Sequence, residues 1–116
     1  MITPADVDLE DIWFRRVVGQ VNDQLMKVAK LKGQNVWNKH DGEDEMFLLV
    51  SGILKMEYED RTVELKVGDL HVVPRGVMHN PIAEEECRVV LIEPASTKHF
   101  GNATTEKAKN LEEQMS

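Results

Sequence analysis

The fold is decided by residues 37–83, which read WNKHDGEDEMFLLVSGILKMEYEDRTVELKVGDLHVVPRGVMHNPIA. In the middle of this stretch, residues 54–58 and 62–67 alternate between apolar and polar side chains, with Asp60-Arg61 between them. A period of two is typical of a strand that has one face in the core and one in water. The pattern therefore predicts an antiparallel hairpin with one wet face and one core face.

Short apolar segments separated by Gly, Pro, Asn and Asp surround this hairpin on both sides. We expect further strands at residues 17–21, 25–31, 36–40, 45–50, 70–73 and 88–93. Strands of this length at this spacing are typical of a small all-β barrel or sandwich. In contrast, residues 104–116 contain good helix formers with a thin apolar stripe, which fits either a short C-terminal helix or a flexible tail.

The composition limits the classes of function. With 116 residues, 41% of them hydrophobic, the chain has the size of one domain with a real core. A net charge of −7 argues against nucleic acid or an anionic membrane as a partner. We find no membrane span and no export signal, so we expect a soluble cytoplasmic protein. The single cysteine, Cys87, begins an apolar run and is interpreted as a buried thiol rather than a nucleophile.

Candidate metal ligands lie at both ends of the deciding stretch. Asn38 and His40 are two residues apart and share a strand face, and a short turn brings Glu45 back beside His40. The Glu45 carboxylate points into an apolar interior, where a cation would remove most of the cost of burial. His79 can enter the same interior after the turn at Pro74. Two imidazoles and a carboxylate suit Fe(II) and similar divalent metals, with Asn38 as a weak ligand or a partner of metal-bound water.

These residues stand in two motifs that resemble those of the cupin superfamily. The segment Asn38-x-His40-x4-Glu45-x6-Gly52 is similar to the first cupin motif, which usually begins His-x-His. The segment Gly68-x5-Pro74-x-Gly76-x2-His79 is similar to the second, which usually ends in Asn where this chain has Ala83. The sequences around residues 73–79 and 91–95 look like single-domain cupins loosely called mannose-6-phosphate-isomerase-like.

The resemblance implies a double-stranded β-helix, the cupin jelly-roll barrel, with a divalent metal (Fe, Mn, Ni or Zn) inside one end. It covers most of the chain, so residues 1–116 are expected to form a single cupin domain with a core at about 17–101 and a tail at 102–116. It also implies a homodimer, since small cupins commonly pair by sheet extension. Asn38 in place of histidine removes one of the four ligands that the family usually brings.

Three further residues are expected to line the pocket: Phe47, Met56 and Tyr58. His71 is interpreted as a satisfied core or surface histidine rather than a ligand. Trp13 and Phe14 are interpreted as lid or dimer-contact residues. They are not a site for stacking bases, because no basic stripe surrounds them.

Three functions remain open at this point, and no residue stands out as catalytic. The first is a metal-dependent isomerase or oxygenase that acts on a small metabolite. The second is a non-catalytic module that binds or senses a small molecule, with a degenerate or empty metal site. The third is a structural role. A sugar phosphate is not favoured as the substrate, because the sequence shows no basic cluster to hold a phosphate.

Overall fold

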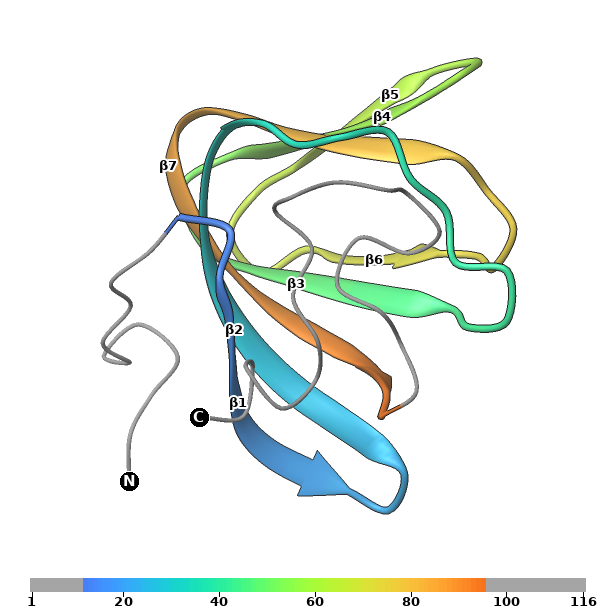
Figure 1. The fold of residues 1–116 in the computed structure, drawn as a ribbon. Coiled ribbons are helices and arrows are strands. Elements are labelled where there is room, and N and C mark those ends of the chain that lie inside the picture. Colours follow the sequence, from blue (N-terminus) through green and yellow to red (C-terminus); the bar gives the residue numbers. More distant parts are fainter. Residues whose placement is uncertain (1–11, 96–116) are drawn as a thin grey trace.

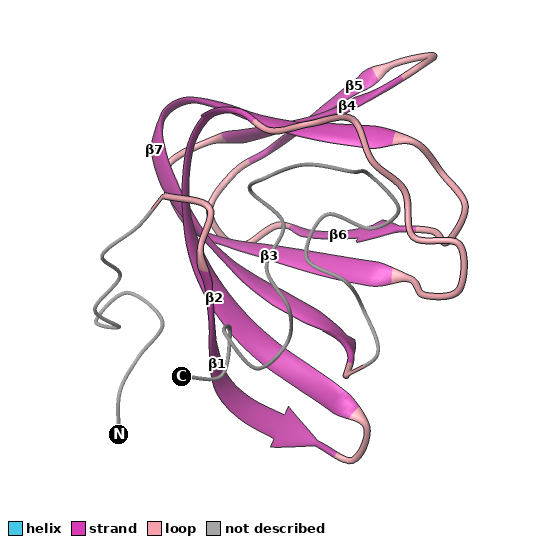
Figure 2. Ribbon diagram, in the orientation of Figure 1, coloured by secondary structure: helices cyan, strands magenta, loops and turns pink. Residues whose placement is uncertain are grey.

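Seven β-strands make up the part of the chain that the structure describes, residues 12–95 of a computed structural model (Figures 1 and 2). All strand pairs are antiparallel, and these residues contain no helix. The strands are β1 (Arg15–Val21), β2 (Gln24–Gln34), β3 (Glu45–Ser51), β4 (Leu54–Tyr58), β5 (Thr62–Leu65), β6 (Leu70–Val73) and β7 (His79–Pro94). The predicted all-β class is confirmed.

Two long strands, β2 and β7, hold the barrel together. They pair along almost their whole length, from Gln24 opposite Pro94 to Gln34 opposite Ile82. The first residues of β7 also pair with β4, and its last residues pair with β3, which in turn pairs with β6. One curved strand therefore belongs to both walls of the barrel, as Figure 1 shows for the orange and yellow ribbon of β7.

The bend in β7 is accommodated by a glycine of the first motif. Gly52 has a φ of +81°, a conformation that side chains disfavour. A Cβ on Gly52 would lie 2.7 Å from the Cβ of Cys87 and 2.9 Å from the carbonyl oxygen of Glu86. This position therefore requires glycine for two reasons, its backbone conformation and the close approach of β7.

The inward faces of the strands form one apolar cluster, and they include the residues expected to line a pocket. Phe47, Met56 and Tyr58 are all buried in this cluster, and half-buried Trp13 packs against it. Cys87 is 1% exposed and belongs to the same cluster, which confirms that it is a buried thiol. The hairpin also follows the predicted alternation, with Leu54, Met56 and Tyr58 inward.

Two strand predictions were wrong in part. Residues 36–40 form a single bridge, Asn38 opposite His79, rather than a strand. The Asn38 side chain donates to the carbonyl of Val36 at 2.9 Å, a local bond that competes with continued strand pairing. In addition, the last strand begins at His79 rather than at residue 88. The predicted tail at 102–116 lies outside the described residues.

The described residues offer no helix with the length and apolar character that crossing a membrane requires.

Candidate metal site

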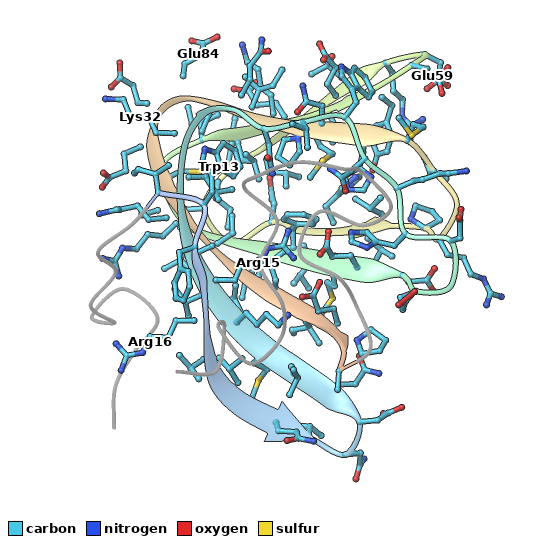
Figure 3. The ribbon with its side chains drawn as sticks, viewed as in Figure 1. Trp13, Arg15, Arg16, Lys32, Glu59 and Glu84 are labelled. Carbon is cyan, nitrogen blue, oxygen red and sulfur yellow. The ribbon has the colours of Figure 1, made fainter. Side chains whose placement is uncertain are left out.

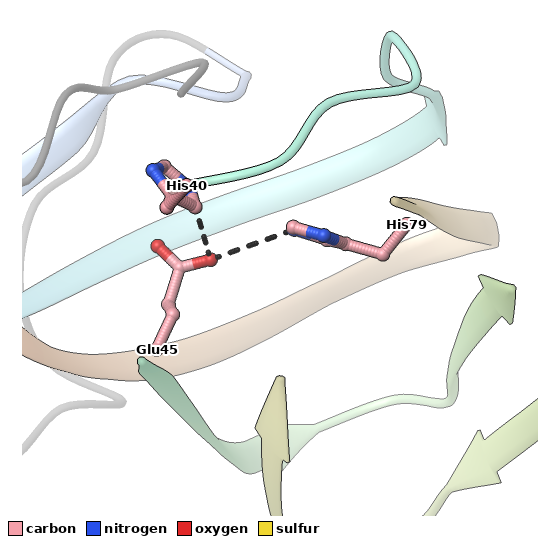
Figure 4. Close-up of side chains that lie close together, drawn as sticks. All are labelled: His40, Glu45 and His79. Carbon is pink, nitrogen blue, oxygen red and sulfur yellow. Dashed lines mark ion pairs between the residues drawn. The ribbon is translucent and has the colours of Figure 1, made fainter. Parts of the chain in front are cut away.

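The three proposed ligands come from three separate parts of the chain and meet inside the barrel (Figure 4). Glu45 is the first residue of β3 and His79 is the first residue of β7. His40 lies in the connection between β2 and β3, where its carbonyl accepts a hydrogen bond from the amide of Gly76 at 2.7 Å. The Pro-x-Gly turn of the second motif therefore fixes the backbone of a first-motif ligand.

The donor atoms of these residues face one another at distances that a shared cation can bridge. Nε2 of His40 lies 3.7 Å from Oε1 of Glu45, and Nε2 of His79 lies 3.8 Å from the same oxygen. These separations are too long for hydrogen bonds. The side chains are 3%, 1% and 1% exposed, and both the His40 Nε2 and the Glu45 Oε1 lack a hydrogen-bond partner. Buried polar atoms without partners are costly. A divalent metal bound to His40, Glu45 and His79 would give each of their donor atoms a partner.

The tautomer of His79 also suits a metal. Its Nδ1 lies 3.0 Å from the carbonyl oxygen of Val77, which can only accept, so Nδ1 carries the proton. The lone pair is then on Nε2, the nitrogen that faces Glu45. Metal-binding histidines commonly donate their second N–H to a backbone carbonyl in this way.

The protonation states follow from burial and from a neighbouring cation. Burial, helped by the positive charge of Arg15, lowers the pKa of His40 to about 4. Burial also lowers the pKa of His79. Burial by itself would raise the pKa of Glu45, but the charge and hydrogen bond of Arg15, together with a hydrogen bond from Glu93 and the charge of Lys27, hold this pKa below its usual value. At neutral pH the site therefore presents two neutral imidazoles and one carboxylate, the forms that bind metals.

A buried charge network supports Glu45, and the sequence analysis missed it. Nη1 of Arg15 (labelled in Figure 3) lies 2.8 Å from Oε2 of Glu45 and 3.2 Å from Oε2 of Glu93. Nζ of Lys27 lies 2.6 Å from Oε1 of Glu93. Lys27 and Glu93 are fully buried, and Arg15 is 7% exposed. Glu45 therefore uses one oxygen for Arg15 and directs the other toward the imidazoles.

The strand alternation carried a signal for this network. Lys27 falls between Leu25 and Ala29 on the inward face of β2, and Glu93 follows Leu91 on the inward face of β7. Charged residues are almost never fully buried without a partner, so opposite charges at inward positions indicate an internal ion pair. The position of Arg15 was harder to predict, because the pattern of β1 contains a bulge between residues 17 and 19.

Asn38 lies next to the three ligands but has a different set of bonds. It exchanges two backbone hydrogen bonds with His79, at 3.0 and 2.9 Å. Directly opposite residues of an antiparallel pair project their side chains to the same face, so Asn38 and His79 share the inner face. Its side-chain amide donates to the carbonyl of Val36. Its role toward a metal stays a prediction.

The other interior histidine, His71, is bonded to tyrosine. The Tyr58 hydroxyl lies 2.5 Å from Nε2 of His71, and the Arg61 guanidinium lies 4.5 Å from the centre of the Tyr58 ring. Tyr58 also lines a groove of about 790 Å³ together with Trp37, Glu57, Glu59, Arg61, Thr62 and Met78. Phe47 and Met56 do not line this groove, and a pocket-lining role for the three residues stays a prediction.

The comparisons with known proteins agree with this fold. The family model described as "Cupin domain" matches residues 24–93, which is more than half of the chain. The chain therefore belongs to the cupin family. One relative is the uncharacterized protein YdbB of Bacillus subtilis (strain 168), which is 32% identical over 63 residues. This match covers 53% of the chain and only 56% of the relative.

Two solved structures are similar over most of the described barrel. A cupin-2 domain containing protein from Shewanella frigidimarina is 37% identical with a TM-score of 0.73, over 74% of this chain and 84% of that one. The protein NMB1881 from Neisseria meningitidis is 26% identical with a TM-score of 0.69, over 74% of this chain and 88% of that one. The double-stranded β-helix fold is confirmed.

Proposed function

We propose that this cupin binds a divalent metal through His40, Glu45 and His79 and uses it to act on a small metabolite. One observation carries the proposal. Three buried donor atoms, all within 4.8 Å of one another, face a common position, and two of them have no hydrogen-bond partner. Buried side-chain donors and acceptors without partners are uncommon in a purely structural interior. Two imidazoles and a carboxylate suit Fe or Mn, with Ni and Zn as further candidates.

The side chains around the proposed metal site have different roles. A bound divalent metal would act as a Lewis acid toward a carbonyl or a similar polar group. Glu45 cannot also act as a free base, since Oε2 is bonded to Arg15 and Oε1 faces the imidazoles. Tyr58, whose hydroxyl is bonded to His71, is the remaining inward-facing candidate for moving a proton among the residues described. These roles fit an isomerase or an oxygenase.

We propose that the chain is related to the mannose-6-phosphate-isomerase-like cupins, but we do not propose a sugar phosphate as its substrate. In the described barrel the buried basic side chains are Arg15 and Lys27, and both are paired with carboxylates. Phosphate sites usually need several free donors. A small metabolite without phosphate is therefore the better candidate, and a cytoplasmic location is the compartment we propose for it.

A non-catalytic binding or sensing role is the second candidate. Its support is that both inward carboxylates, Glu45 and Glu93, are already held by cations, which leaves no obvious general base. A binding module needs only shape and a few polar contacts. Such a protein would bind its small molecule without turning it over.

The first test is the metal content of the untagged protein, measured by elemental mass spectrometry after purification without chelator. We expect about one equivalent of Fe, Mn, Ni or Zn, since one set of three ligands is present. Metal below about a tenth of an equivalent, with no recovery on adding metal, would contradict the metal proposal and favour the metal-free binding module.

A pair of variants assigns the metal to this site. His79→Ala should abolish stoichiometric metal, because it removes one of three donors, while the β-rich circular dichroism stays intact. His71→Ala is the matched control, since His71 also faces the interior but bonds to Tyr58 and lies outside the three-residue set. Retention of metal by the His79 variant would overturn the ligand assignment.

A further inference from the structure

We propose that the metal-loaded site takes a small carboxylate anion as its ligand, and that Arg15 is the positioning residue that sets this preference. The inference rests on the metal-dependent function proposed above and names the class of ligand. It starts from the two oxygens of Glu45, which face different partners. Oε2 accepts from Arg15 at 2.8 Å, whereas Oε1 faces His40 and His79.

This division removes much of the negative charge that Glu45 would otherwise give a metal. The side chains of Arg15 and Glu45 are 8% and 1% exposed, so water screens their attraction only weakly. Arg15 also prevents Oε2 from turning toward the imidazoles, so Glu45 is available as a donor of one oxygen. A cation held here would therefore keep more of its own positive charge than beside an unpaired carboxylate.

The sum of charges over the buried network of Arg15, Lys27, Glu45 and Glu93 also leaves the charge of a bound metal uncompensated. The charges of Arg15 and Lys27 cancel those of Glu45 and Glu93. An imidazole that gives its lone pair to a metal adds no charge of its own. Both charges of a divalent metal would then be uncompensated among these buried groups, and an anionic ligand relieves that cost.

The surroundings favour a carboxylate over a phosphate. A carboxylate can bind a cation through one oxygen without further donors. Phosphate oxygens are usually held by several N–H groups or cations. Here Arg15 and Lys27 already bind carboxylates. Glu43 also acts on His40, but it is only half-buried on the 41–44 connection, so it compensates the site weakly.

The experiment uses the full chain loaded with Co²⁺, whose visible absorption reports on its ligands. Acetate is titrated against acetamide, a neutral molecule of nearly the same shape, and against inorganic phosphate at equal ionic strength. We expect acetate to change the spectrum at a concentration at least about tenfold lower than acetamide or phosphate, because only acetate combines negative charge with little need for donors.

Three variants then test the part of Arg15. Arg15→Gln keeps a donor for Glu45 but removes the charge, and should weaken acetate binding about tenfold while tightening Co²⁺ binding and changing the Co²⁺ spectrum. Arg15→Lys keeps the charge and should stay within about threefold of the parent protein. Lys27→Gln removes a charge from the same network but no contact with Glu45, so it can lower acetate affinity while it should leave the Co²⁺ spectrum unchanged.

The outcomes separate the two proposals. If the parent protein binds no Co²⁺ at all, the proposed function fails. If it binds Co²⁺ but treats acetate, acetamide and phosphate alike, or prefers phosphate, the ligand class is wrong. If Arg15→Gln leaves the Co²⁺ spectrum unchanged, as Lys27→Gln should, Arg15 does not set the donor properties of Glu45 and has only a structural role. Should Arg15→Gln not fold, the acetate preference of the parent protein and its retention in Arg15→Lys decide the matter.

Discussion

Asn38 is the residue at which this chain departs most from the ligand set of its family. It stands directly opposite His79 and shares its face, so an imidazole at this position would reach the same interior. We predict that Asn38→His tightens metal binding at least about tenfold, because it adds a fourth nitrogen donor. Competition against a chelator of known affinity measures the change. An unchanged dissociation constant would show that position 38 does not reach the site.

Cys87 offers a prediction about pH. Burial, together with the charge of Glu86, raises the pKa of this thiol to about 11. Because the raised pKa favours the protonated form, the thiol contributes stability that is complete below its unfolded pKa and is lost as pH rises through 11. We expect native protein at pH 9 to react with iodoacetamide far more slowly than protein unfolded in urea, as followed by mass spectrometry. Equal rates would contradict burial of the thiol.

At the scale of single residues, the sequence predicted the candidate metal ligands and missed the charged residues that support them. His40, Glu45 and His79 were predicted because residue type and spacing, together with the resemblance to the cupin motifs, pointed to a metal, and the structure brings them together. Arg15 was missed because its partners lie 30 and 78 residues away. The bulge in β1 also disturbs the alternation that would have marked Arg15 as an inward charge.

At the scale of elements, the approach of β7 to Gly52 yields a stability prediction. Gly52→Ala should lower the free energy of unfolding by about 2–4 kcal/mol, because it combines a positive φ with a Cβ clash against Cys87. Gly68→Ala is the matched control: its φ is +92° but no atom lies within 4 Å of an added Cβ. It should cost only about 1 kcal/mol.

Urea denaturation followed by circular dichroism measures both glycine variants. Equal losses would mean that the backbone conformation alone sets the requirement for glycine, and that the contact with Cys87 adds nothing. A small loss for Gly68→Ala and a large one for Gly52→Ala would identify the close approach of the two strands as the larger cost.

Strands were predictable where one face met the core and one met water. The hairpin of β4 and β5 has this pattern, and its alternation identified it. The start of β7 was missed because its first half contains Asn80, Pro81 and an exposed acidic run at 84–86, which resemble a loop. The start of the strand forms because β4 pairs with residues 79–82 on one side and β2 pairs with residues 82 and 83 on the other. Tertiary pairing overrides the local preference there.

At the scale of the whole molecule, we propose a homodimer that forms through the outer face of β6. Among the described strands, β6 pairs only with β3, and its outward residues Leu70 and Val72 are 63% and 50% exposed. These residues stand opposite Leu48 and Met46, beside an outer apolar cluster built around Val90. An apolar edge strand of this kind commonly marks an association surface.

The dimer is tested by light scattering coupled to size-exclusion chromatography. We expect the parent chain to elute as a dimer and Val72→Lys as a monomer. Val18→Lys provides the control, since Val18 is similarly exposed at 47% but lies on β1, the other edge of the sheet. A monomeric parent protein, or a dimer that only the Val18 variant disrupts, would contradict this interface.

The buried guanidinium of Arg15 also limits how far the chain can be truncated at its N-terminal side. The family match begins at residue 24, whereas Arg15 lies in the strand before it. A fragment trimmed to residues 24–93 would keep Glu45 and Glu93 in an apolar interior with only Lys27 between them. Carboxylates left in this way favour their protonated forms, so the fragment would gain stability as the solution becomes more acidic. The segment that matches the family model is therefore shorter than the segment needed to neutralise the buried carboxylates, which must include Arg15 on β1.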